Sequence, residues 1–188
     1  MTHLIVDMNS KKDSLGFYEF VLPIISVVET LDSFVVRHYT EVNANEAEAS
    51  DSIILSGTPL KDNATLNQTD KFGWMKNCSK PILGICAGMQ TIGLIFGSKL
   101  TKCLGMGMTK VSTIVENPLF SSTFQAYSLH NYSVVPSVEF EVIAESGQCS
   151  QAIKHRQRNI YGILFHPEVR NHEILQRFVY TISKHRRV

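Results

Sequence analysis

The chain has 188 residues, of which 44% are hydrophobic and 19% are charged, a composition that suits one compact globular domain spanning residues 1–188. Its 18 basic and 17 acidic side chains leave a formal net charge of +1, too small to favour nucleic acid or an anionic membrane as a partner. No stretch approaches the length of a membrane span, so we expect a cytoplasmic protein that acts on a small polar substrate or a protein partner.

The cysteine pattern argues against two structural roles. The chain has neither a CxxC pair nor the dense, even spacing of a disulfide framework. We therefore expect no structural zinc site and predict four free thiols. The cysteines are Cys78, Cys86, Cys103 and Cys149.

The chain opens with a strand, a helix and a second strand. Residues 3–8 and 33–39 have the short, β-rich apolar pattern of strands. Between them, residues 17–31 have the apolar spacing of a helix that faces a core, and Pro23 predicts a kink or an early end in it. A β-α-β unit of this kind is typical of parallel sheets.

Two further apolar runs indicate central strands. Residues 52–57 and 81–86 are nearly all apolar and end in glycine or cysteine, as expected of strands that helices cover on both faces. The segment between them is mixed and polar, with a short helix predicted around 70–78. Residues 88–97 then predict a helix closed by Gly97.

The pattern changes in the second half of the chain. Short β-rich stretches predict antiparallel strand additions, and a final helix is predicted at 171–187 with basic residues at its C-terminal end. The predicted fold is α/β, with an open, mostly parallel sheet, helices on both faces and antiparallel additions in the C-terminal half. The stretches are 110–115, 123–129, 140–144, 151–156 and 160–165.

The sequence GICAG places Cys86 at the junction of a predicted strand and a predicted helix. A sharp turn of this kind is a nucleophile elbow. Gly84 and Gly88 would let strand and helix approach closely, and free N–H groups at the helix N-terminus would stabilise a thiolate. The alternative is that Cys86 is a small buried hydrophobic side chain, the commoner role of a free cysteine, and the pattern alone leaves both open.

A candidate base lies near the C-terminus of the chain. In the sequence FHPEV, His166 follows an apolar run, and Glu168 lies close enough for its carboxylate to fix the imidazole tautomer. The alternative is a strand-end histidine that is bonded only to the backbone. Together with His172 and Glu173, these residues show no zinc-site pattern, so we predict no metal.

A third element is the turn Ser-Gly-Thr-Pro that ends the run at 52–57. Backbone N–H groups of Gly57 and Thr58 could face a developing oxyanion together with the N–H of Ala87. Thr58 is β-branched and precedes proline, which excludes a backbone conformation there that only glycine adopts. The alternative is a plain turn.

The motifs GICAGMQ at 84–90 and HPE at 166–168 resemble those of the class I (triad) glutamine amidotransferases, whose elbow reads G-x-C-x-G-x-Q and whose triad closes with H-P-E. The resemblance covers nearly the whole chain. It implies an open sheet with helices on both faces, no cofactor, and hydrolysis of glutamine to glutamate and ammonia.

The resemblance also implies a role for each matching residue. Cys86 would attack the side-chain amide of glutamine, and His166 would shuttle the proton. Glu168 would orient His166, and Gln90 would help to hold the substrate. The ammonia would then pass to a synthetase on a partner chain or domain.

The stretch at 151–169, QAIKHRQRNIYGILFHPEV, is similar to the end of the amidotransferase subunit of the two-subunit GMP synthetases of archaea. This resemblance implies that the partner is the ATP-pyrophosphatase subunit of a GMP synthetase, and a docking role for the charged residues at 154–156 is a hypothesis. The alternative is a solvated hairpin whose charges keep a strand edge soluble.

The chain differs from such subunits in three places. Its oxyanion turn has Gly-Thr-Pro in place of Gly-Gly-Pro, and residues 7–14 lack a glycine- and glutamine-containing loop. The loop at 128–134, SLHNYSV, replaces the usual Ser-His-x-Asp and offers His130 and Asn131 as candidate substrate contacts. Two other functions therefore stay open: a free-standing hydrolase of glutamyl amides, and a catalytically idle regulatory module on the same fold.

Overall fold

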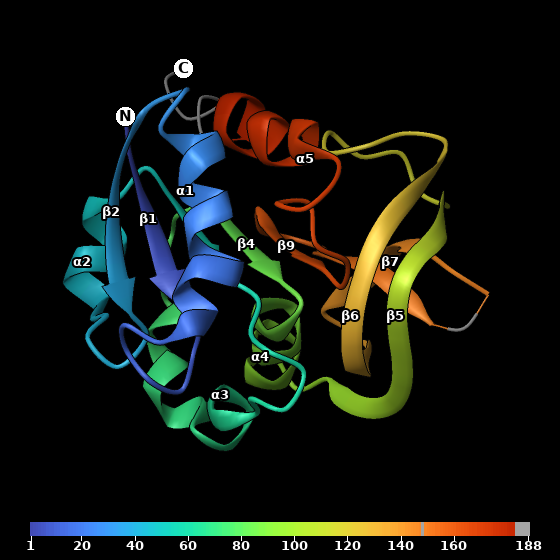
Figure 1. The fold of residues 1–188 in the computed structure, drawn as a ribbon, viewed down its shortest axis with the longest axis horizontal. Helices are drawn as coiled ribbons and strands as arrows, with labels where there is room; N and C mark the ends of the chain where they lie inside the picture. Colours follow the sequence, from blue (N-terminus) through green and yellow to red (C-terminus); the bar gives the residue numbers. More distant parts are fainter. Residues whose placement is uncertain (148, 183–188) are drawn as a thin grey trace.

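The computed structural model of the chain describes residues 1–147 and 149–182, and the strands of this part join in one nine-stranded sheet (Figure 1). The strands are β1 (Thr2–Asp7), β2 (Ser33–His38), β3 (Ser52–Leu55), β4 (Ile82–Ile85), β5 (Lys99–Thr113), β6 (Thr123–Val135), β7 (Phe140–Glu145), β8 (Ser150–His155) and β9 (Ile160–Ile163). The helices are α1 (Leu22–Val28), α2 (Ala44–Ala49), α3 (Ala64–Asn67), α4 (Ala87–Ile95) and α5 (His172–Arg177), with π-helical segments at Phe17–Val21 and Phe178–Ile182 and a 3-10 helix at Thr69–Lys76.

The sheet has a parallel half and an antiparallel half. Its strand order is β2-β1-β3-β4-β9-β8-β7-β5-β6. Neighbours run parallel from β2 to β9, and antiparallel from β9 to β6. This arrangement confirms the predicted α/β fold with antiparallel additions in the C-terminal half.

Strand β9 belongs to both halves. It pairs parallel with β4 on one side and antiparallel with β8 on the other. The prediction of a purely antiparallel addition at 160–165 is therefore wrong for the contact with β4. All four residues of β9 are buried, which is the pattern of a central strand covered on both faces.

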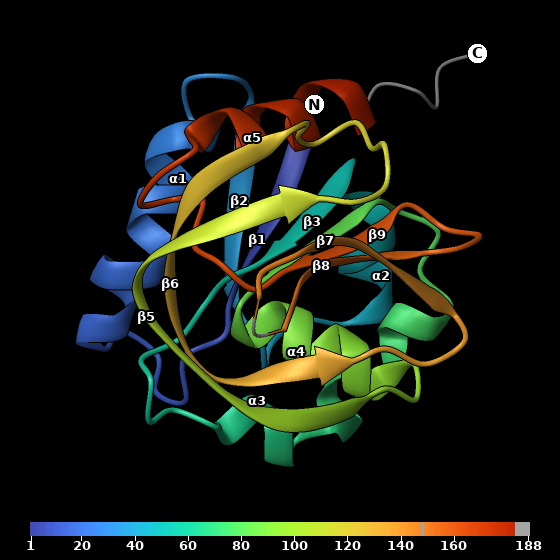
Figure 2. The ribbon, with the colours of Figure 1, turned by 90° about the vertical axis from the view of Figure 1, so that its right-hand side faces the viewer.

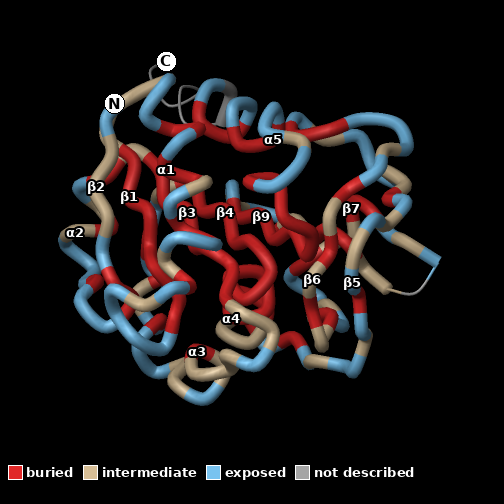
Figure 3. Tube along the Cα trace, in the orientation of Figure 1, coloured by how far each residue is buried: buried red, intermediate tan, exposed pale blue. Residues whose placement is uncertain are grey.

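Helices cover the two faces of the parallel half, and the buried residues follow this sheet through the middle of the molecule (Figure 3). Successive side chains of a strand point to opposite faces, so β1 contributes to two separate cores. Ile5 packs in a cluster with Ile24 of α1 and Ile174 of α5. Leu4 packs in the other cluster, with Met89 of α4. The parallel part of the sheet thus has a buried hydrophobic core on each of its two faces.

Strands β5 and β6 are longer than the sequence predicts, and they curl across the molecule as a two-stranded ribbon (Figure 2). We expected strands only at 110–115 and 123–129. Gly105 and Gly107 interrupt the β-rich pattern of β5, and one face of this strand is solvent-exposed, so its apolar side chains do not mark a core.

Three helical predictions need comment. Pro23 lies in the first turn of α1, where proline is tolerated, so it marks the change from the π-helical segment to α1. Helix α2 was not predicted because only Ala47 of its residues is buried, and a side-chain cap by Asn43 fixes its start. Gly97 follows α4 with a φ of +79°, as predicted for a helix end.

The described part of the final helix ends at Ile182, and the basic residues at 184–187 lie outside the described residues. Within the described part of the chain, no helix is long and apolar enough to cross a membrane.

Candidate active site

Cys86 lies at the sharp turn between β4 and α4. Its φ of +48° and ψ of −100° fall outside the regions that non-glycine residues ordinarily adopt, which is the strained backbone expected of a nucleophile elbow. A Cβ atom on Gly84 would come within 2.6 Å of the Gly88 carbonyl oxygen, and one on Gly88 within 2.7 Å of the Leu55 carbonyl oxygen. The two glycines are therefore required for the close approach of strand and helix, as predicted.

Replacement of Gly88 by alanine is expected to destabilise the fold. The added methyl group would meet the backbone of Leu55, which cannot rotate away, and overpacking of this kind costs about 1–3 kcal/mol. Thermal or denaturant unfolding measures the loss. Gly73→Ala is the matched control, because a Cβ there meets nothing within 4 Å. Equal stability of the two variants would contradict the packing account of the elbow.

His166 and Glu168 form a buried pair beyond the end of β9. The Nδ1–H of His166 donates to Oε1 of Glu168 at 2.7 Å, and neither side chain is exposed. Burial alone would lower the pKa of His166. The negative charge of Glu168 and the neighbouring Cys86 outweigh this, so the pKa of His166 lies well above its ordinary value of 6.5. The imidazolium form is favoured next to the thiol.

The structure thus brings Cys86, His166 and Glu168 together from two separate turns of the chain. Sγ of Cys86 and Nε2 of His166 contact the same backbone carbonyl, that of Leu129, each at 3.4 Å, and Glu168 holds the other ring nitrogen of His166. This is the geometric order of a nucleophile, a base and an orienting group. Cys86 is only 4% exposed, which would also suit a structural thiol, so it is the nearness of the His166–Glu168 pair that favours the reactive role.

The predicted oxyanion residues lie close to Cys86 and His166. Gly57 packs directly on the imidazole, since a Cβ there would lie 2.7 Å from Cε1 of His166. As expected of a β-branched residue before proline, Thr58 has no positive φ. Its hydroxyl donates to the carbonyl of Asp62 at 3.0 Å. Ala87 is the first residue of α4, so its N–H has no acceptor within the helix.

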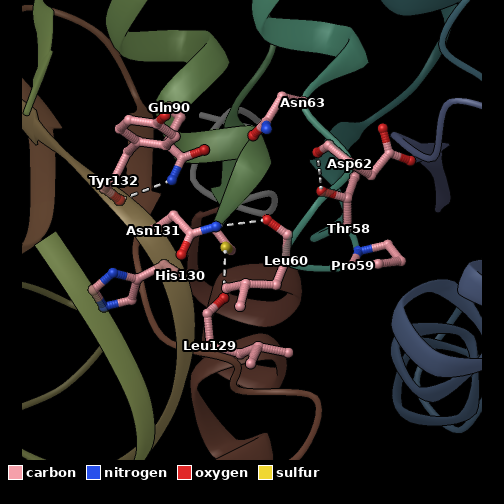
Figure 4. Close-up of a pocket in the computed structure, with 11 residues that line it drawn as sticks. Thr58, Pro59, Leu60, Asp62, Asn63, Gln90, Leu129, His130, Asn131 and Tyr132 are labelled. Atoms are coloured by element: carbon pink, nitrogen blue, oxygen red, sulfur yellow. Dashed lines mark hydrogen bonds between the residues drawn. The ribbon is translucent and has the colours of Figure 1, made fainter. Parts of the chain in front are cut away.

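The segment at 128–134, which we expected to be a loop, lies inside β6 and forms one wall of a cleft over Cys86 (Figure 4). The side-chain amide of Gln90 donates to the carbonyl of Tyr132 at 2.8 Å, and that of Asn131 donates to the carbonyl of Leu60 at 2.8 Å. The side chains of Gln90 and Asn131, which we expected to contact the substrate, therefore bond to backbone carbonyls in the walls of the cleft.

His130 lines the cleft, but its imidazole turns towards β5. Its Nδ1–H donates to the carbonyl of Cys103 at 2.8 Å, and the ring fits only because Gly105 has no side chain. Burial lowers the pKa of His130 below 6.5, and the nearby His166 adds to this effect. The structure thus gives the side chain of His130 a place in the wall of the cleft and no contact with Cys86.

Leu129 is the residue that the sequence did not reveal. Its carbonyl oxygen accepts a hydrogen bond from the Cys86 thiol at 3.4 Å (Figure 4). It accepts another from Nε2 of His166 at 3.4 Å. Because a backbone carbonyl is common to every residue, no sequence pattern identifies it.

Among the described residues, no group of three or more His, Cys, Asp or Glu side chains is placed to hold a metal ion.

Comparison with known proteins points to one family. The family model described as glutamine amidotransferase class-I matches residues 21–182. A glutamine-hydrolyzing GMP synthase subunit from Methanocaldococcus jannaschii is 39% identical over 67% of the chain and 71% of its own length. The protein of the same name from Methanosphaera stadtmanae is 38% identical over 54% of the chain and 61% of its own length. The crystal structure of a GMP synthase subunit from Thermoplasma acidophilum superimposes with a TM-score of 0.81 and 26% identity, over 95% of this chain and 92% of that one.

Proposed function

Because the chain belongs to the class-I glutamine amidotransferase family, we propose that it hydrolyses glutamine to glutamate and ammonia through a triad of Cys86, His166 and Glu168 and delivers the ammonia to a synthetase subunit. The observation that supports this most strongly is that Sγ of Cys86 and Nε2 of His166 each lie 3.4 Å from the carbonyl oxygen of Leu129, while the other ring nitrogen of His166 is bonded to the buried Glu168. A structural cysteine would not need a base held in this way.

The first half-reaction forms a thioester. The sulfur of Cys86 attacks the carboxamide carbon of glutamine, and the oxygen becomes an oxyanion next to the N–H of Ala87 at the start of α4. The proton of the Cys86 thiol passes to His166, which delivers it to the amide nitrogen. The C–N bond breaks, and ammonia leaves.

The second half-reaction restores the enzyme. His166, now neutral, takes a proton from water, and the resulting hydroxide attacks the thioester carbon. The C–S bond breaks, glutamate leaves, and the sulfur of Cys86 again faces the imidazolium. The raised pKa of His166 suits the first half-reaction, in which this residue must carry a proton for the departing nitrogen.

We further propose that the partner is the ATP-pyrophosphatase subunit of a GMP synthetase. The relatives named above are glutamine-hydrolyzing subunits of GMP synthases, a name that implies a second subunit. Of the sequence KHR at 154–156, at the end of β8 and the start of the following turn, the exposed Arg156 and the half-buried Lys154 could face a partner, whereas His155 is buried and pairs with Glu139. Ammonia released at Cys86 would then serve as the nitrogen source for the synthetase.

Glutamate release by the purified chain tests both parts of this proposal. We expect weak release by the chain alone and at least a tenfold increase when nucleotide substrates are added together with the candidate synthetase subunit. Full release without any partner would favour a free-standing hydrolase of glutamyl amides. No release in either setting would favour a catalytically idle module.

A further inference from the structure

The cleft over Cys86 is nearly full. Its volume is about 10 Å³, which is roughly the space that one water molecule needs. The side chain of glutamine cannot enter a space of this size. The residues that fill it from the side of β6 are those at 129–132, which we call the strap.

The strap occupies the position that a substrate needs. The carbonyl oxygen of Leu129 lies 3.4 Å from both Sγ of Cys86 and Nε2 of His166, and it accepts a hydrogen bond from each. A glutamine carboxamide must bring its own carbonyl group within similar reach of the sulfur before attack. The Leu129 carbonyl and the substrate carbonyl therefore compete for one place.

Two side-chain amides hold the strap closed. Asn131 reaches out from the strap to the carbonyl of Leu60, in the turn that follows Thr58. Gln90 reaches from α4 to the carbonyl of Tyr132. Figure 4 shows these two bonds, which tie the strap to α4 and to the turn at Leu60, at the two residues that lie beyond the Leu129 contact and His130.

The strand ladder is interrupted behind the strap. Tyr132 pairs with Lys102 and His130 pairs with Gly105, so two residues of β5 oppose Asn131 alone. In a β-bulge of this kind the extra residue is left unpaired and the bulged strand, here β5, bends locally. The strap therefore lies across a break in the ladder that joins β6 to β5.

We propose that the strap at 129–132 is an autoinhibitory element that keeps the catalytic pair covered in the isolated chain, and that Asn131 is its latch. Release of the latch lets the Leu129 carbonyl leave Cys86 and His166, and the glutamine carboxamide takes its place. This inference rests on the proposed glutaminase function. Closure of the strap also limits access to the Cys86 thiol, and this access can be measured without glutamine or a partner.

Alkylation of Cys86 by iodoacetamide measures the opening of the strap. The thiolate displaces iodide, and a C–S bond replaces the C–I bond. The alkylation rate constants of the isolated chains are compared at a pH high enough that a further increase no longer raises them. Differences between variants then do not come from ionisation of the thiol. We expect Asn131→Ala and Asn131→Leu to raise the rate constant about fivefold, since one net hydrogen bond shifts an equilibrium by this order. Asn131→Leu keeps the size of the side chain and removes only the amide.

Asn63→Ala is the matched control, because Asn63 lines the same cleft and its side chain makes no hydrogen bond among the described residues. It should be alkylated at the wild-type rate. Wild-type rates for both Asn131 variants, or an equal increase for Asn63→Ala, would overturn the proposal. Cys78 is buried and reports on general opening of the fold. If its alkylation accelerated together with that of Cys86, the strap would not be the moving part, and the proposal would also fail.

Discussion

Cys86→Ala is expected to abolish glutamate release, with a loss of about 10⁴-fold or more when the synthetase subunit is present. Alanine provides no nucleophile, while the bonds of His166 to Glu168 and to the Leu129 carbonyl can remain. It should adopt the φ of +48° about as readily as cysteine does, because both side chains begin with one Cβ atom. The loss should therefore reflect chemistry and not folding, which a thermal unfolding curve verifies.

Cys149→Ala provides the control for this variant. Cys149 is a free, half-buried thiol outside the cleft, so its loss should leave glutamate release close to the wild-type value. If Cys86→Ala retained more than a hundredth of the activity, Cys86 would not be the nucleophile, and the assignment of the elbow would have to be abandoned.

Glu168→Gln should lower glutamate release about 10³–10⁴-fold and change its dependence on pH. The carboxylate stabilises the imidazolium, so its removal lowers the pKa of His166. The wild-type enzyme keeps its proton on His166 up to a pH well above 6.5, and its rate should fall only above that raised pKa. In the variant, the decline on the alkaline side should begin at a lower pH.

A pH profile of kcat/KM for both proteins measures this shift. Glu173→Gln removes an exposed carboxylate from the first turn of α5 and serves as the control, with an expected profile like that of the wild type. An unchanged alkaline limb in Glu168→Gln would mean that Glu168 does not set the protonation of His166.

The sequence was sufficient to predict the parallel half of the fold and to select Cys86, His166 and Glu168, which the structure brings together and whose catalytic roles stay a prediction. Buried parallel strands are near-continuous apolar runs, as at 81–86, and an elbow needs small residues at fixed positions around its nucleophile. These are local requirements, so they are visible in a short stretch of sequence. The two turns that carry Cys86 and His166 come together because β4 and β9 are neighbours in the sheet.

The antiparallel half was less predictable because its constraints come from distant contacts. The pairing of β9 with β4 depends on the order of strands in the sheet, which local pattern does not specify. The early start of β5 at Lys99 is equally hidden, since the strand has an exposed face and contains glycines. Its partner β6 is ordered through this pairing, which is why the segment at 128–134 is a strand and not a loop.

The sequence indicated which side chains line the candidate site, but not which backbone carbonyls these side chains contact. Gln90, Asn131 and His130 all line the cleft, as their motifs suggested, but their polar groups bond to carbonyl oxygens of the chain itself. Sequence patterns describe what a side chain can bind and not which carbonyl will lie opposite. The contact of Leu129 with the catalytic pair follows from the curvature of β6, which only the structure shows.

Labelling by a diazoketone analogue of glutamine, mapped by peptide mass spectrometry, tests the central claim most directly. Burial raises the pKa of Cys78, and burial together with a hydrogen bond to Cys149 raises that of Cys103 to about 12, so neither thiol is a good nucleophile. We predict a single adduct on Cys86 that forms faster with the synthetase subunit present and is absent from Cys86→Ala. An adduct on Cys78 or Cys103, or one that persists in Cys86→Ala, would contradict the assignment of Cys86 as the nucleophile of glutamine hydrolysis.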